Sequence, residues 1–155
     1  MKKLLYIVIA APLLFISAKG TLFSSRAPES GITYIKQTGN GLPFSKAVRA
    51  GDMVYLSGMI GAGADGKLIA GFDAQAKQTM DNIAAILKSQ GLSMTNVVKC
   101  TVMIHDMANY NAFNNIYKTY FNKDHYPARS AFGANALAFG AEMEVDVIAY
   151  DPKNK

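Results

Sequence analysis

The last β-strand that the sequence predicts carries acidic residues at every second position. Residues 142–150 read EMEVDVIAY, with Glu142, Glu144 and Asp146 two apart. Acidic residues are depleted in strands, and side chains two apart in a strand share one face of the sheet. Three carboxylates therefore repel one another along a single stripe. Two interpretations stay open: a sheet face in contact with water, or a face on which one acid serves a pocket.

Apolar periodicity and turn residues predict the other elements of a single domain, which a chain of 155 residues is long enough to form. Helices are expected over 73–90 and 109–121. Strands are expected over 32–37, 97–104, 128–136 and 142–150, with two more around a turn at 50–52 within 46–61. The order β-β-β-α-β-α-β-β indicates an α+β domain with one sheet and two helices on one face. The other face, with the acidic stripe, then contacts water or another subunit.

Residues 1–20 have the pattern of a secretory signal peptide. Two lysines precede an apolar run, Leu4 to Ile16, and small residues follow it. The run is shorter than the roughly 20 residues that span a bilayer. We expect cleavage after Ala18 or Gly20 and a periplasmic or secreted mature protein, with a retained membrane anchor as the alternative.

The rest of the chain is expected to form a linker, residues 21–31, and one folded domain, residues 32–151. Removing the signal leaves 13 basic residues against 11 acidic ones, without a basic run. Neither a nucleic-acid partner nor, after cleavage, a membrane partner is therefore expected.

Few residues in the chain are suited to bind a metal. The two histidines, His105 and His125, lie twenty residues apart, and Cys100 is the single cysteine. No metal site is expected from this pattern, and an intrachain disulfide is impossible. Cys100 lies among apolar residues and is expected to fill the core. The segment GAGADG at 61–66 has the letters of a phosphate-binding motif but lacks the helix that must follow, so a turn is expected.

Arg129, in YPARSAFG, is the arginine that most suggests chemistry. It follows a proline and opens a predicted strand. The planar fork of a guanidinium binds a carboxylate at two points, which lysine cannot do. An ion pair with an acid on a neighbouring strand is the alternative.

Several segments together resemble the RidA/YjgF family of enamine/imine deaminases. They are PFSKAVRAGDMVYLSGMIG, FDAQAKQTMDNIAAIL, NVVKCTVMIHDMANYNAFNNIYKTYF, PARSAFG and MEVDVIA, spread over about residues 40–150. The resemblance implies a chorismate-mutase-like fold, a homotrimer with a site in each cleft between subunits, and no cofactor. In such a trimer the uncovered sheet face would point to the interior.

The resemblance also implies roles for individual residues. Arg129 matches the arginine that holds the substrate carboxylate, and Glu144 the glutamate associated with the hydrolytic water. Substrate-binding positions are expected at the polar or backbone sites Ser57, Gly58 and Asn114. Two further positions depart from the family: Phe44 stands where tyrosine is common and Ala131 where cysteine is common.

The function implied is hydrolysis of a 2-imino acid to a 2-keto acid and ammonia. Arg129 would hold the carboxylate, and Glu144 would act first as base and then as acid. A second interpretation stays open, in which a periplasmic trimer binds small carboxylates without chemistry. The missing hydroxyl at Phe44, the missing thiol at Ala131 and the export signal favour it. RNA cleavage, attached to some relatives, lacks support because the chain has no basic stripe.

Overall fold

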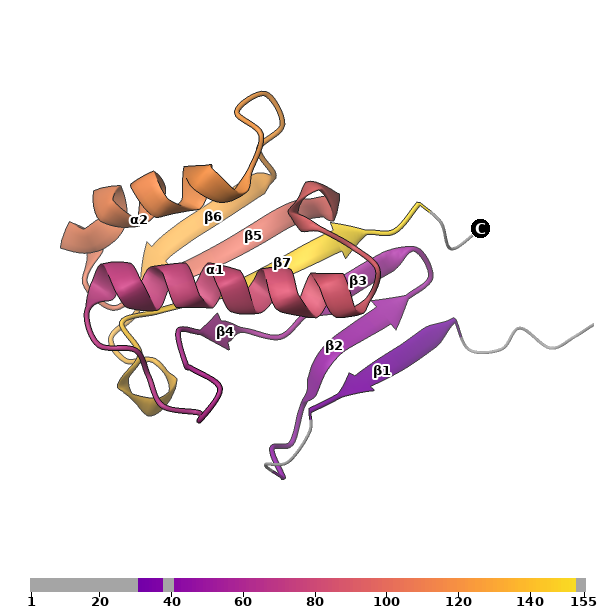
Figure 1. Cartoon of the computed structure of the whole chain (residues 1–155), viewed down its shortest axis with the longest axis horizontal. Helices are drawn as coiled ribbons and strands as arrows, with labels where there is room; N and C mark the ends of the chain where they lie inside the picture. Colours follow the sequence, from indigo (N-terminus) through magenta and orange to yellow (C-terminus); the bar gives the residue numbers. More distant parts are fainter. Residues whose placement is uncertain (1–30, 38–40, 153–155) are drawn as a thin grey trace, which may run out of the picture.

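The computed structural model describes residues 31–37 and 41–152 (Figure 1). The expected signal peptide and nearly all of the expected linker lie outside these residues, so those predictions stay as predictions. Within the described part, no helix has both the length and the apolar character needed to cross a membrane.

One mixed sheet forms the backbone of the domain. Its strands run in the order β1-β2-β3-β7-β5-β6, and β4 pairs with β7 beside that path. All neighbours are antiparallel except β5 and β6. The bounds are β1 Ile32–Lys36, β2 Ser45–Ala50, β3 Met53–Leu56, β4 Met59–Ile60, β5 Val97–Ile104, β6 Ala128–Gly133 and β7 Met143–Tyr150.

Both long helices lie on one face of this sheet (Figure 1). They are α1, Phe72–Ser89, and α2, Tyr110–Tyr117. The expected α+β class and element order are confirmed, with β4 as an addition. The second helix is shorter than the expected 109–121, because the chain tightens into 3-10 turns at Met107–Asn109 and Lys118–Tyr120. The expected strand 128–136 likewise ends early, at Gly133.

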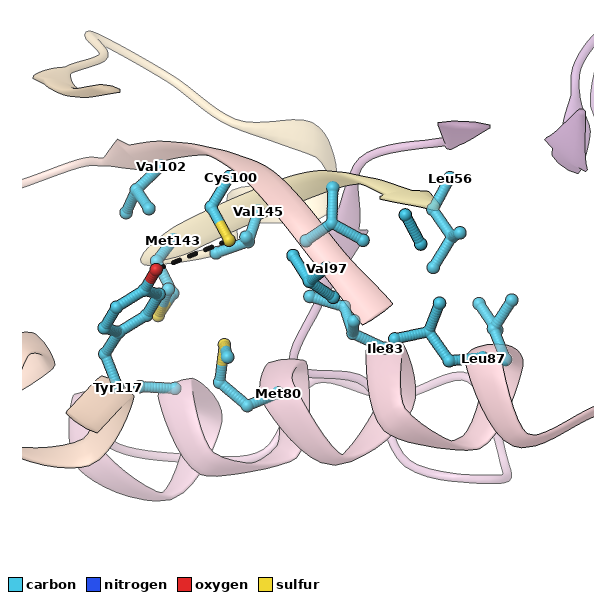
Figure 2. Close-up of a cluster of buried hydrophobic side chains, with 14 of the residues drawn as sticks. Leu56, Met80, Ile83, Leu87, Val97, Cys100, Val102, Tyr117, Met143 and Val145 are labelled. Carbon is cyan, nitrogen blue, oxygen red and sulfur yellow. Dashed lines mark hydrogen bonds between the residues drawn. The ribbon is translucent and has the colours of Figure 1, made fainter. Parts of the chain in front are cut away.

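The core fills the space between the helices and the sheet (Figure 2). In β7 the apolar residues Met143, Val145 and Val147 are completely buried, whereas Glu144 and Asp146 are half-buried on the opposite face. Cys100 is buried as expected, and its sulfur accepts a hydrogen bond from the hydroxyl of Tyr117 at 3.5 Å, drawn as a dashed line in Figure 2. The alternation in EMEVDVIAY is thus the alternation between core and open face.

The open face of the sheet is not purely polar. Tyr55 lies opposite Ile148 of β7, and Phe132 lies beside Met103, which in turn faces Glu144. Tyr55 and Phe132 are both exposed large hydrophobic side chains. Exposed apolar groups on a sheet face that also carries acids suit contact with another protein surface better than contact with water alone.

Candidate functional site

Glu144 lies against a glycine in the connection between β3 and β4. It is opposite Ile60 of β4. A Cβ atom built on Gly58 would overlap Oε1 of Glu144 and lie 2.7 Å from its carboxyl carbon. Gly58 is therefore the residue that lets the backbone and the carboxylate approach so closely. From the sequence, Gly58 is expected to be a substrate-binding position, and that role stays a prediction.

The surroundings of Glu144 raise the pKa of its carboxyl group. Burial is the largest cause, and the negative charge of Asp146, two residues along the same face, adds to it. Both effects disfavour the ionised form of the acid. A carboxyl group with a raised pKa holds its proton more readily than an ordinary glutamate, which favours its use as a general acid after it has acted as a base.

A cavity of about 1090 Å³ adjoins this carboxylate. Four of the residues predicted from the sequence line it: Phe44, Ser57, Gly58 and Glu144. The Ser57 hydroxyl donates a hydrogen bond to the carbonyl oxygen of Ser45 at 2.7 Å, so within the protomer its proton is already used. Ser57 thus ties the β3–β4 connection to β2 and leaves its oxygen lone pairs for a ligand.

Two amides of α1 tie neighbouring segments to the helix, and one of them, Asn82, holds the wall of this cavity in position. Gln75 is 3% exposed; its side chain donates to the carbonyl of Ile69 at 3.0 Å and accepts from the backbone N–H of Glu142 at 2.7 Å. Asn82 donates to the carbonyls of Ile60 and Ala62, each at 3.0 Å. Gln75 is thus a buried polar residue whose amide is satisfied by hydrogen bonds to segments outside the helix.

We expect Gly58→Ala to lower, about a hundredfold, the imino-acid hydrolysis that the sequence resemblance implies, while leaving the domain folded. The added methyl group takes the place of the Glu144 carboxylate and pushes it out of position, and a misplacement of about 1 Å can cost that much. Circular dichroism and the rate of ammonia release from an imino acid would measure the two effects. Gly31→Ala is the control for the loss of a glycine, since a Cβ there would lie no nearer than 3.9 Å to another atom and Gly31 does not line the cavity. Equal activity losses in the two variants would contradict the importance of the contact.

Arg129 lies under α2 among aromatic rings. Its guanidinium carbon is 4.6 Å from the ring centroid of Tyr117, 5.6 Å from that of Tyr110 and 5.9 Å from that of Phe113. Its Nη2 donates a hydrogen bond to the Tyr110 hydroxyl at 3.0 Å. Cation–π contacts of this kind fix the plane of the guanidinium. These rings pack in or against the hydrophobic core, and they also orient the arginine.

The charge of Arg129 has no counterion within the described part of the protomer. No carboxylate there lies within ion-pair distance of it. The alternative drawn from the sequence, an ion pair with an acid on a neighbouring strand, is therefore not found among these residues. A half-buried guanidinium with remaining donors is suited to bind an anionic ligand.

Asn114 and Ala131 accompany Arg129 rather than Glu144. Asn114 lies on α2 between Tyr110 and Tyr117, at the spacing that places helix residues side by side. Ala131 follows Arg129 on the same face of β6 and packs partly against the core. The predicted residues thus form two groups, one around Glu144 and one around Arg129.

The two groups lie on opposite faces of the sheet. Arg129 pairs with buried Cys100 on the helix-covered face, whereas Glu144 pairs with Met103 on the open face. β5 lies between β6 and β7, so the two backbones are also about 10 Å apart across the sheet. One protomer therefore cannot bring Arg129 and Glu144 to the same small ligand.

The comparison with known proteins then identifies the family. A model of the family described as Endoribonuclease L-PSP matches residues 37–151. The chain belongs to this family. The resemblance in the sequence to RidA/YjgF proteins is thereby confirmed.

Relatives in the L-PSP family include deaminases of reactive imines. The human protein named 2-iminobutanoate/2-iminopropanoate deaminase is 42% identical over 109 residues, which are 69% of this chain and 79% of the human one. The crystal structure of yeast Mmf1 has a TM-score of 0.72 at 32% identity, covering 77% of this chain and 98% of that one. RidA from the Antarctic bacterium Psychrobacter has a TM-score of 0.69 at 34% identity, with the same coverage.

The chemistry open to these residues is acid-base and electrostatic. The described residues contain no group of three or more His, Cys, Asp and Glu side chains placed to hold a metal ion. They do contain a cation with free donors and a carboxyl group with a raised pKa. Together these can bind an anion and transfer a proton to or from water.

Proposed function

We propose that the protein hydrolyses reactive 2-imino acids to 2-keto acids and ammonia. The reaction would take place in clefts of a homotrimer, where the Glu144 group of one protomer meets the Arg129 group of its neighbour. The main support is the position of the two residues on opposite faces of one sheet, since a shared ligand then requires two protomers. The names of the relatives support the chemistry, and the exposed aromatic residues on the open face support the assembly.

The residues of the chain supply each step of this hydrolysis. The Arg129 guanidinium holds the substrate carboxylate beside the C=N carbon. Glu144, ionised, removes a proton from a water molecule as the water oxygen bonds to that carbon, and the C=N π electrons move to nitrogen. Glu144 then returns the proton to nitrogen, which gives a carbinolamine. Glu144 next removes the hydroxyl proton of this carbinolamine and passes it to nitrogen as the C=O bond forms and the C–N bond breaks, so ammonia leaves. The balance is one imino acid and one water to one keto acid and one ammonia.

The departures at Phe44 and Ala131 leave these steps in place. Neither the hydroxyl nor the thiol that relatives carry there takes part in the transfer described above. The backbone carbonyl of residue 131 could still accept a hydrogen bond from the imine nitrogen or the water. Phe44 lacks the hydroxyl with which a tyrosine would make a polar contact at the cavity wall. Its effect is therefore on the orientation of the substrate more than on proton transfer.

Ammonia release tests the proposal directly. A flavin amino-acid oxidase with catalase generates the imino acid, and semicarbazide traps what remains of it. The wild-type protein is expected to lower the trapped fraction and accelerate ammonia release over buffer. Saturable binding of the 2-keto acid by the wild-type protein without any acceleration would contradict the enzyme and establish the alternative, a binder of small carboxylates.

We also propose that the mature protein acts in the periplasm or outside the cell, after loss of residues 1–20. The support is the pattern of lysines, apolar run and small residues at the start of the chain. Cell fractionation with N-terminal sequencing of the mature protein tests it. A protein that starts at Met1 in the cytosolic fraction would contradict it.

A further inference from the structure

Two exposed phenylalanines line the cavity that adjoins Glu144. Phe139 is 81% exposed and Phe44 is 48% exposed, and both belong to the cavity wall. Large aromatic side chains normally stabilise a fold by burial, so neither residue serves the core of the protomer. Their place beside Glu144 indicates contact with a ligand.

Phe139 is also held in an unfavourable backbone conformation. Among the described residues, Phe139 is the one non-glycine residue with a positive φ, which is 57°. Such a conformation suits glycine or asparagine, and a bulky residue there is rare. Strained residues of this kind collect at functional sites. An exposed aromatic ring in a strained turn is thus unfavourable for folding on two counts, which points to a role in binding.

The rest of the cavity wall is mostly apolar. The apolar residues that line it besides the two phenylalanines are Leu42, Met59, Ile60, Ala62, Ala64, Ala85, Ile86 and Ala138, and the uncharged polar side chains are Gln37, Ser57 and Asn82. Lys46 and Asp65 lie on the same wall with opposite charges, so they give no preference for a charged side chain. A volume of about 1090 Å³, even when a neighbouring protomer fills part of it, is on the scale of pockets for large organic ligands. A methyl or ethyl group would leave most of this apolar surface without contact.

We propose that this site takes 2-imino acids with bulky apolar side chains, aromatic or branched aliphatic, and that Phe139 and Phe44 form the wall against which that side chain packs. The inference rests on the proposed hydrolysis at Glu144. It differs from what the human relative's name states, since 2-iminopropanoate and 2-iminobutanoate carry a methyl and an ethyl group. The class of reaction that supplies such substrates is two-electron oxidation at the α-carbon of apolar amino acids, with a flavin or a nicotinamide as the electron acceptor.

A substrate series measured with one variant and one control tests the preference. Imino acids are generated by the oxidase from alanine, 2-aminobutyrate, leucine and phenylalanine, and kcat/KM is compared for each. Phe139→Gly removes the ring and gives the left-handed turn the residue that suits it, so the variant keeps its fold. Tyr34→Ala removes an aromatic side chain that is 63% exposed on β1 and does not line the cavity.

The wild type is expected to prefer the phenylalanine-derived imine over the alanine-derived one by about tenfold or more. Phe139→Gly should lose about tenfold on the bulky imine and little on the small one, and Tyr34→Ala should retain the wild-type ratio. If kcat/KM is higher for the small imines and Phe139→Gly leaves it unchanged for every imine, the inference is overturned and the proposed function stands. Absence of hydrolysis with every imine would overturn the proposed function itself.

Discussion

Arg129→Ala is expected to lower kcat/KM for imino-acid hydrolysis by about a thousandfold. The substitution removes two charge-assisted hydrogen bonds to the substrate carboxylate, each worth roughly 2 kcal/mol. Because no carboxylate of the described residues pairs with Arg129, its loss leaves no unpaired acid behind within the protomer. Steady-state kinetics on an imino acid generated in situ would measure the effect.

Two further variants separate geometry from charge. Arg129→Lys keeps the positive charge but lacks the planar fork, so we expect a loss of about tenfold to a hundredfold. Arg49→Lys is the control, because Arg49 is engaged with Asp151 at 2.7 Å and lies outside both groups of site residues. The account is contradicted if Arg129→Ala, shown to be folded and assembled, retains wild-type kinetics.

Glu144→Gln is expected to lower kcat by a hundredfold to ten-thousandfold with a smaller change in KM. Glutamine matches the shape of the acid and can still contact Gly58, yet it can neither accept nor return the proton. The loss should therefore lie mainly in the chemical step. Single-turnover measurements would show whether substrate still binds, and an unchanged kcat would exclude Glu144 as the base.

The pH profile should follow the charge of Asp146. That charge raises the pKa of Glu144, after the larger effect of burial. Asp146→Asn removes the repulsion and lowers the pKa of Glu144, and a base with a lower pKa stays ionised to lower pH. The acidic limb of kcat/KM against pH should then shift to lower pH. An acidic limb that keeps its position in Asp146→Asn, or moves to higher pH, would contradict the assignment of this limb to Glu144.

Much of the fold could be predicted because local patterns agree with the tertiary structure. The apolar residues of α1 recur at helical spacing, and Gly91, with φ of 73°, stands just past the end of the helix, where glycine is favoured. β4 could not be predicted as a separate strand, since two residues give no periodicity and the second strand expected within 46–61 ran on through Ser57 and Gly58. The ends of α2 were missed for a similar reason, because 3-10 turns continue the same aromatic spacing.

The candidate site, too, could be predicted from the sequence only in part. Arg129 and Glu144 stood out from residue chemistry and from the resemblance. Gln75 did not, because its burial depends on a hydrogen bond from Glu142, 67 residues away along the chain. Phe139 did not either, since its exposure and its backbone conformation follow from tertiary contacts. The positive φ of Phe139, next to Gly140, leaves no pattern that sequence periodicity can detect.

The central claim is that one protomer supplies Arg129 and its neighbour supplies Glu144. Co-expression of differently tagged Arg129→Ala and Glu144→Gln chains, followed by purification on both tags, tests it most directly. Every mixed trimer then has one cleft in which both residues are wild type, so activity of about a third of the wild-type value should return although each parent is inactive. Mixed trimers as inactive as their parents would contradict the claim.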